Sequence, residues 1–270
     1  MSQADGTLGG EEPANEALLT CLDKIPGLRQ RFEKVELGHP LIGSSEAHDC
    51  VVRYGGDRPG GTASIKLSVA LDHLTTWRRV IYDARVIPMC AHFTLLRPVF
   101  EGAVQSRWLL DPDVDAANRV RRALGAAIAD LRWLGEAETN MLLHPSWKPS
   151  VAYVTAAARI AELEQQAAAA DLRPISMPST PKLLKDYALH APGLDTFAFR
   201  YTSGILHGQS WAALMGDLRA RAGETIGGFI ATGDQGVAAG FTASAVEHFD
   251  AAVRAYEGYV ESETPPSKTR

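Results

Sequence analysis

The sequence predicts an all-α fold, a single-domain helical bundle of about six to eight helices over residues 64–261. Apolar residues recur at helical spacing through most of the chain, and segments that alternate like β-strands are few. With 46% of its 270 residues apolar, the chain can also bury a substantial core. These observations together favour packed helices over a sheet.

The chain before the bundle is predicted to form a helical extension and a loop. Residues 1–14 are small, acidic and glycine-rich, which is typical of a disordered tail. Residues 15–63 begin with one or two short helices, broken near Pro26-Gly27. They continue as a long loop rich in glycine and proline over residues 38–63. A loop of this length is usually functional or mobile.

The first half of the bundle is expected to contain four helices. Helix 64–86 begins at Ser64, a favourable N-cap residue, and carries one apolar stripe. Helix 89–110 is apolar on most sides, so we expect it at the centre. Helix 114–138 repeats apolar residues at helical spacing, and helix 150–172 is rich in alanine, the best helix former.

The second half is expected to contain three helices and a tail. Helix 179–189 begins with an N-cap threonine followed by proline, which is favourable at the first helical position. Helix 194–218 follows a Pro-Gly pair, with Asp195 as its expected cap. Helix 241–261 closes the bundle, and residues 262–270 are predicted to be a disordered tail.

Charge and cysteine content predict a cytoplasmic protein. The formal net charge is −5, which argues against a nucleic-acid coat protein but allows a local basic cleft. Cys21, Cys50 and Cys90 are scattered and odd in number, as is typical of reduced thiols. The N-terminus lacks the pattern of a signal peptide, and no apolar run reaches the ~18 residues of a membrane span.

Metal and cofactor motifs are largely missing from the sequence. It contains no phosphate-binding G-x-x-x-x-G-K-[ST], no H-E-x-x-H and no paired Glu-x-x-His. The pair His48-Asp49 lies in the glycine-rich loop, where a lone dipeptide is weak evidence for a ligand set. The sequence therefore predicts neither a bound metal nor a cofactor.

One candidate site is the segment LLRPVFEGAVQSRWLL. Arg97 and Glu101 are spaced i, i+4 in a helix that is otherwise apolar, so they can pair. Buried charges are costly without partners, so we expect the pair to lie mostly out of solvent, against the helix that carries His207. Pro98 cannot donate to the carbonyl of Thr94, which favours a kink there. The alternative is a structural clamp between helices.

A second candidate site is the segment FRYTSGILHG. Read as a helix, it places Arg200, Ser203 and His207 on one face at i, i+3 and i+7. His207 can act as an acid or a base near neutral pH, and Arg200 can hold a phosphate or carboxylate. Gly204 and Gly208 would allow another backbone to approach closely. The alternative is therefore a tight helix crossing sealed by the polar side chains.

Arg200, six residues and His207 together resemble the R-x(4–6)-H motif of the HEPN superfamily. The residue after the arginine is often polar in that family and is Tyr201 here. The resemblance implies a helical bundle and, in its nuclease members, metal-independent RNA cleavage at a dimer interface. His207 would then activate the RNA 2′-OH or protonate the leaving oxygen, and Arg200 would stabilise the phosphorane. It also implies a role linked to RNA or nucleotides in stress or defence.

A second resemblance covers most of the bundle. The segment LLRPVFEGAVQSRWLLDP followed by YTSGILHG resembles a group of bacterial helical proteins with an R-x-x-x-E helix and an S-x-x-x-H-G helix. This resemblance implies the fold more than an activity.

Other functions stay open from the sequence. A small-molecule binder or an enzyme of specialised metabolism would use a pocket between the central helices. That pocket would be lined by Arg97, Glu101, Trp108, Ser203, His207 and Trp211. A non-catalytic interaction module would use the same residues for self-association.

An RNA-binding role would also need local cations. Two basic clusters are the candidates, with solvated helix faces as the alternative reading: Arg119, Arg121 and Arg122, and Arg78 and Arg79. The partners expected from the sequence are a second copy of the chain, and RNA or a small molecule, with no membrane.

Overall fold

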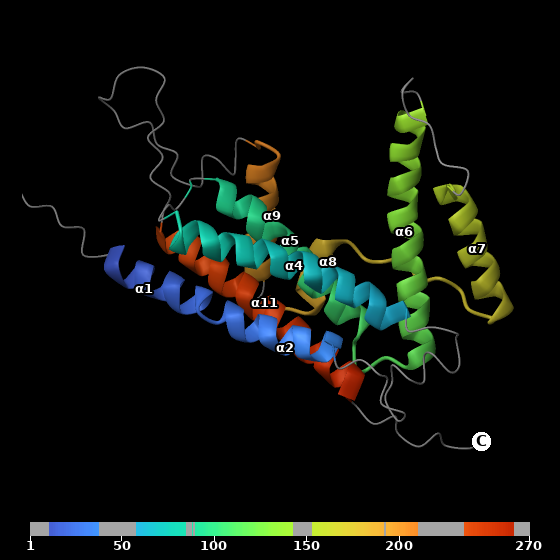
Figure 1. The fold of residues 1–270 in the computed structure, drawn as a ribbon, viewed down its shortest axis with the longest axis horizontal. Coiled ribbons are helices and arrows are strands. Elements are labelled where there is room, and N and C mark those ends of the chain that lie inside the picture. The colour runs from blue at the N-terminus through green and yellow to red at the C-terminus, as the bar shows by residue number, and fades with distance from the viewer. Residues whose placement is uncertain are drawn as a thin grey trace, which may run out of the picture. The chain divides into compact units, whose positions relative to one another are not determined.

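The computed structural model describes residues 11–37, 58–84, 88, 90–142, 153–191, 193–209 and 235–261. Throughout these ranges the chain forms helices and short connections, without a strand (Figure 1). The predicted all-α fold is therefore confirmed. The helices are α1 Glu11–Leu22, α2 Ile25–Leu37, α4 Arg58–Tyr82, α5 Ala91–Leu109, α6 Ala116–Leu142, α7 Ala156–Ala169, α8 Thr180–Asp186, α9 Leu194–Leu206 and α11 Gln235–Glu261.

The helices group into two compact units. The first unit draws on Met1–Leu37, Lys66–Gln105 and Thr180–Arg254. The second unit draws on Gly38–Ile65, Ser106–Ser179 and Ala255–Arg270. Helices α4, α5 and α11 each contribute residues to both.

Three helices begin earlier than the sequence predicts: α1, α4 and α11, the last of which starts at Gln235 and not at residue 241. Helix α1 starts at Glu11, inside the segment expected to be a tail. Helix α4 starts at Arg58, inside the expected loop, so Ser64 is an interior residue and not the N-cap. Proline is tolerated in a first helical turn, but the glycines that follow it have a low helix propensity. Contacts made by the start of α4 offset this cost. Arg58 donates to Gln166 Oε1 at 2.5 Å, and Ser106 Oγ donates to the carbonyl of Ala63 at 3.3 Å.

The predicted break near Pro26-Gly27 is confirmed. Helix α1 ends at Leu22 and α2 begins at Ile25, which places Pro26 in the first turn of the second helix. Both helices pack in the first unit, where α2 runs beside α4 and α11 (Figure 1). There the apolar stripe predicted for helix 64–86 is buried: Leu67, Leu71, Leu74, Trp77 and Ile81.

The core of the first unit joins α4, α5, α9 and α11 through aromatic contacts. Trp77 is fully buried and donates from Nε1 to Thr242 Oγ1 at 3.0 Å. The ring of Phe93 meets those of Tyr201 and Phe241 edge-on, at centroid distances of 5.0 and 5.4 Å. Edge-to-face pairs of this kind add to the stabilisation that apolar burial provides.

A buried histidine completes this core. His92 is 1% exposed and stacks on Trp77 with ring centroids 5.5 Å apart. Its Nδ1 donates to the carbonyl of Pro88 at 2.7 Å, while Nε2 has no hydrogen-bond partner within the described residues. Burial lowers the pKa of His92 to about 4, although the bond to Pro88 opposes this. The ring is therefore held neutral.

The second unit is organised around α6 and α7, which lie side by side (Figure 1). Beyond α7 the chain returns to α6, where the amide of Ile175 donates to the carbonyl of Arg121 at 2.9 Å. Gly125 makes this approach possible, because a Cβ atom at Gly125 would lie 1.9 Å from the carbonyl oxygen of Ile175. The glycine is required by packing, not by its backbone conformation.

We predict that the stability of the protein depends on pH through His92. A folded pKa below the unfolded value of 6.5 means that its contribution is present above pH 6.5 and is lost as pH falls toward 4. The loss amounts to about 3 kcal/mol over that interval. Urea titrations between pH 7 and 4.5 should show a flatter pH dependence for His92→Leu than for wild type. Parallel curves would show that the pKa of His92 is the same in the folded and the unfolded protein.

We also predict that Gly125→Ala destabilises the second unit by about 1–3 kcal/mol or more, because the backbone at Ile175 must move. The matched control is Gly258→Ala on α11, where a Cβ would meet nothing within 4 Å. That change should stabilise by about 0.5–1 kcal/mol, as glycine weakens a helix interior. Thermal unfolding measures both, and equal melting temperatures for the two variants would contradict the close approach.

Candidate functional site

The His-Gly pair of the segment FRYTSGILHG ends helix α9. Gly208 has a φ of +63°, and its amide donates to the carbonyl of Ile205 at 3.0 Å. The amide of Gln209 donates to the carbonyl of Gly204 at 2.8 Å. These two bonds and the left-handed glycine form a Schellman motif, with His207 as the C-cap. The helix predicted over residues 194–218 therefore ends at Leu206.

This ending changes the interpretation of Gly208. A Cβ at Gly208 would meet no described residue within 4 Å, so no close helix crossing within the described chain requires this glycine. Its role is the positive φ that stops the helix. The signal was available in the sequence, since a glycine after an apolar helical segment is a typical C-terminal signature.

Arg200, Ser203 and His207 keep a common face despite the early ending. The amide of His207 still donates to the carbonyl of Ser203 at 3.0 Å, so its backbone follows the helical register. Residues seven apart lie within about 20° of each other around a helix. Arg200 and His207 are exposed, and Ser203 is half-buried. Their side chains make no hydrogen bond or ion pair with any residue that the structure describes.

The Arg97–Glu101 pair lies beside α9 and is half-buried. Nη1 of Arg97 is 3.8 Å from Oε2 of Glu101, and the two side chains are 25% and 36% exposed. The guanidinium lies over the ring of Phe199 at 5.3 Å, which confirms the expected contact with α9. Most of each side chain is out of solvent, as expected, although neither is fully buried.

Glu101 has further hydrogen-bond partners, whereas one nitrogen of Arg97 has none within the described residues. Glu101 accepts from Thr180 Oγ1 at 3.4 Å and from Gln105 Nε2 at 3.5 Å. By contrast, Nε of Arg97 is buried and has no hydrogen-bond partner among the described residues. An arginine with an unused donor at a helix contact is suited to an anion.

Of the two tryptophans predicted to line the same pocket, the structure describes Trp108. Trp108 is buried in the second unit, where the guanidinium of Arg122 lies over its ring at 5.0 Å. Trp211 lies outside the described residues.

The basic cluster Arg119, Arg121 and Arg122 is structural. Arg119 is 1% exposed and donates from Nε and Nη2 to the carbonyl of Asp111, at 2.9 and 2.7 Å. Arg121 donates to the carbonyl of Arg173, and Arg122 to that of Trp108. These guanidinium groups satisfy backbone carbonyls at the ends of helices and in connections. Arg119 is therefore no part of a solvated face, whereas Arg121 and Arg122 are half-buried.

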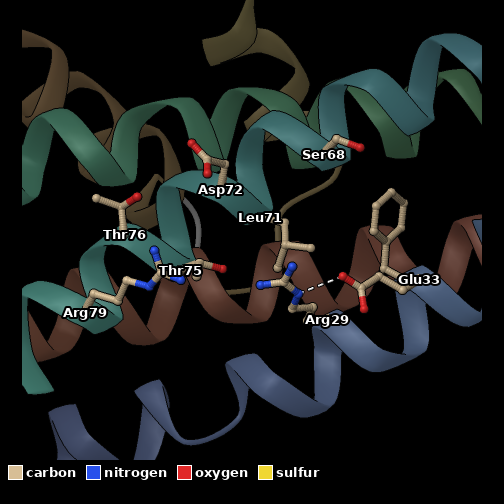
Figure 2. Close-up of a pocket in the computed structure, with 9 residues that line it drawn as sticks. Arg29, Glu33, Ser68, Leu71, Asp72, Thr75, Thr76 and Arg79 are labelled. Carbon is tan, nitrogen blue, oxygen red and sulfur yellow. Dashed lines mark hydrogen bonds and ion pairs between the residues drawn. The ribbon is translucent and has the colours of Figure 1, made fainter.

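A polar groove lies between α2 and α4 (Figure 2). It encloses about 590 Å³ and includes Arg79 of the second basic cluster. Its walls carry charges of both signs, and Arg29 is already paired with Glu33 at 2.7 Å. Arg78 is turned to the ring of Tyr82, 4.5 Å away. The groove therefore offers no uniform charge for a nucleic acid.

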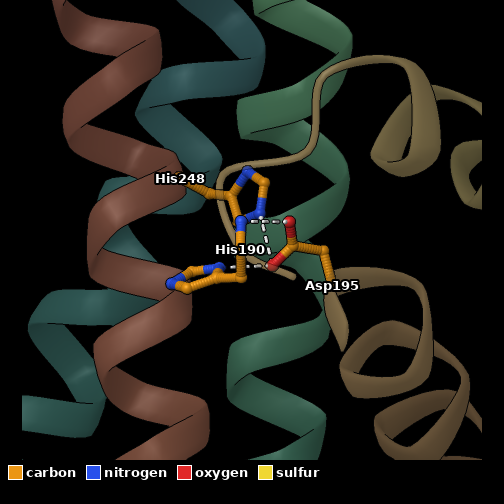
Figure 3. Close-up of side chains that lie close together, drawn as sticks. All are labelled: His190, Asp195 and His248. Carbon is orange, nitrogen blue, oxygen red and sulfur yellow. Dashed lines mark hydrogen bonds and ion pairs between the residues drawn. The ribbon is translucent and has the colours of Figure 1, made fainter. Parts of the chain in front are cut away.

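A cluster of two histidines and one aspartate lies at the other end of α9 (Figure 3). Asp195 is in the first turn of α9, His190 precedes that helix, and His248 is on α11. Nδ1 of His190 lies 2.5 Å from Oδ1 of Asp195, and Nε2 of His248 lies 3.2 Å from the same oxygen. Asp195 and His248 are fully buried.

Asp195 does not cap α9 as predicted. The N-cap is Gly193, with a φ of +86°. The Asp195 carboxylate accepts instead from the backbone amides of Leu189 and His190, at 2.8 and 3.3 Å. The side chain thus holds the turn that precedes the helix.

The groups of this cluster shift each other's pKa values. Burial raises the pKa of Asp195, but the amide of Leu189 and the two imidazoles outweigh it, so the pKa lies below its ordinary value. Burial likewise lowers the pKa of His190, but Asp195 and Glu247 outweigh it and raise that pKa. Nε2 of His190 lies 2.7 Å from Oε2 of Glu247. The aspartate is therefore a carboxylate at neutral pH.

The sequence analysis missed this cluster because its members follow no motif spacing. His190 and Asp195 are five residues apart in a connection, and His248 is on another helix. The one available signal was a histidine on the apolar face of the segment FTASAVEHFDAAV. Such a histidine needs a polar partner when it is buried.

Comparison of this chain with family models, with curated proteins and with solved structures found no match. Among the described helices, none is both long and apolar enough to cross a membrane.

We predict that Glu101→Ala destabilises the protein by about 1 kcal/mol, because water partly replaces the lost acceptor of this half-buried pair. The control is Glu33→Ala, which breaks an exposed i, i+4 pair with Arg29 and should cost less than about 0.5 kcal/mol. Urea denaturation measures both variants. A loss of ~3 kcal/mol or more for Glu101→Ala would mean that Arg97 behaves as a fully buried charge.

Proposed function

We propose that the protein is a HEPN-like ribonuclease that cleaves RNA without a metal ion, with Arg200 and His207 as its catalytic pair. The observation that supports this proposal most is their placement. Both side chains are exposed on one face at the C-terminal end of α9, free of partners within the described chain. Groups used for packing would be paired or buried, as Arg119 is.

The chemistry needs only these groups. An imidazole takes the proton of the RNA 2′-OH, and the oxygen attacks the adjacent phosphorus. The bond to the 5′-oxygen breaks, and a second, protonated imidazole gives that oxygen a proton. The products are a 2′,3′-cyclic phosphate and a 5′-hydroxyl end. Arg200 stabilises the added negative charge of the phosphorane, and Ser203 can donate to a phosphate oxygen.

Because each chain supplies one His207, the acid and the base come from two copies of the chain. Apolar side chains on α9 support such an association. Leu194 and Phe197 are 51% and 39% exposed, and they continue at i, i+3 spacing to Arg200. A contact between two α9 helices would bury these side chains and bring both catalytic pairs to one cleft.

A second candidate function is the binding of a small anion at Arg97. The buried Nε without a partner favours it, since an incoming carboxylate or phosphate oxygen would satisfy that donor. This function needs Arg97 and Glu101 but not His207, so substitutions separate the two candidates.

The ribonuclease proposal is tested by cleavage of single-stranded RNA in the presence of EDTA. Arg200→Ala and His207→Ala should each lower the rate by ~10²–10⁴-fold, as removal of a proton-transfer or charge-stabilising group does. The control is Arg254→Ala, which removes an exposed arginine of the same unit that pairs with Asp250. Its rate should equal that of wild type.

Mixing wild type with an excess of His207→Ala tests the shared cleft. Because cleavage needs the His207 imidazole of both copies, a mixed dimer has lost either the acid or the base, and wild-type activity should fall in proportion to the dimers that contain the variant. An absence of cleavage by wild type in EDTA would contradict the ribonuclease. Reduced anion binding by Arg97→Ala, with His207→Ala unaffected, would then support the second candidate.

A further inference from the structure

The cluster of His190, Asp195 and His248 has the composition of a metal site. Each side chain offers one ligand atom, and these atoms all lie within 4.8 Å of one another. We propose that these three residues bind a divalent transition-metal ion, of which zinc is the best match. The proposal goes beyond the metal-independent ribonuclease and does not depend on it.

The carboxylate of Asp195 is oriented as a metal ligand. Oδ2 accepts the backbone amides of Leu189 and His190, which fixes the plane of the carboxylate. Oδ1 faces the two imidazoles and also accepts a hydrogen bond from Ser244 Oγ at 3.4 Å. One oxygen is thus committed to the fold and the other is directed at the ligand atoms of the histidines.

The histidines are oriented by neighbouring groups. Nε2 of His190 lies 2.7 Å from Oε2 of Glu247, so its other nitrogen, Nδ1, faces the cluster. A carboxylate behind a ligating imidazole is the usual arrangement around protein-bound zinc, where it sets the tautomer and strengthens the ligand. The ring of His248 is held edge-on to Phe100 at 5.7 Å. Both rings are therefore positioned before an ion arrives.

The donor set selects the class of ion. Two imidazole nitrogens and one carboxylate oxygen suit zinc and neighbouring divalent transition metals, whereas calcium and magnesium prefer oxygen ligands. Three protein ligands leave a fourth position for water. His190 is 24% exposed, so the cluster is reached from solvent on that side, while His248 and Asp195 close the other.

Binding requires only a small adjustment. Two ligands of one tetrahedral zinc ion lie about 3.3 Å apart, at metal–ligand distances of about 2.0 Å. Nε2 of His248 already lies 3.2 Å from Oδ1, but Nδ1 of His190 lies 2.5 Å from it. The imidazole of His190 must move outward by about 1 Å and release its Nδ1 proton to solvent, and His248 must release its Nε2 proton or carry it on Nδ1 instead, so that both nitrogens can bind the ion.

The site is also separate from the proposed catalytic pair. Asp195 is in the first turn of α9 and His207 follows its last, so about 18 Å of helix lies between them. RNA cleavage in EDTA therefore tests the ribonuclease alone, and metal binding tests this proposal alone.

The test uses the full chain after treatment with EDTA and removal of the chelator. We expect wild type to take up about one equivalent of Zn²⁺ in competition with a chromophoric chelator, with a rise in melting temperature. Co²⁺ in its place should give the visible absorption of a four-coordinate ion. His190→Gln and His248→Gln should each weaken Zn²⁺ binding by at least about 100-fold, and Glu247→Gln by about 10- to 100-fold.

The matched control is His73→Gln, which removes a half-buried histidine of α4 outside the cluster and should bind Zn²⁺ like wild type. If His248→Gln fails to fold, His190→Gln and the exposed Glu247→Gln decide the outcome. Uptake of no Zn²⁺ by wild type, or equal uptake by wild type and the His190 and Glu247 variants, would overturn the proposal. The cluster would then be a hydrogen-bonded support for the start of α9.

Discussion

The first unit depends on the hydrogen bonds and ion pairs that the buried carboxylate of Asp195 makes. A charge without solvent is tolerated only when hydrogen bonds and opposite charges surround it, and here two backbone amides and two imidazoles do so. Those partners come from the connection before α9 and from α11. The need to give Asp195 these partners thus sets where α9 begins and how α9 lies against α11. The position of α9 in turn sets the direction of the face that carries Arg200.

Helix α9 carries different chemistry at its two ends for reasons that follow from helix geometry. The positive end of the helix dipole at its first turn favours a carboxylate, and Asp195 lies there, bonded to the amides of Leu189 and His190 and beside the histidines. Its last turn is closed by Gly208 in a Schellman motif, which satisfies the final carbonyls through the backbone alone. The side chain of His207 is therefore not needed as a cap and is left in solvent, where a substrate can reach it.

Arginine residues show how one side chain can have opposite roles. The guanidinium groups of Arg119 and Arg122 donate to backbone carbonyls, and that of Arg122 also lies over an aromatic ring. A run of basic residues in the sequence therefore does not by itself mark a nucleic-acid surface. Arg97 is intermediate, since it contacts Phe199 and lies near Glu101 but leaves Nε unused. Arg200 is the exposed member, and its exposure rather than its charge makes it a candidate for binding phosphate.

The sequence by itself determined the helical fold, the buried stripe of α4 and the break between α1 and α2, because periodicity and turn residues act locally. It also brought Arg97 to the helix of His207 correctly, since charges in an apolar helix must meet a neighbour. Only the tertiary structure decided where α4 begins, which carbonyls the arginines of residues 119–122 bind, and which histidines lie together. Those features depend on residues far apart in the chain, and no local spacing records which carbonyl or carboxylate a side chain will reach.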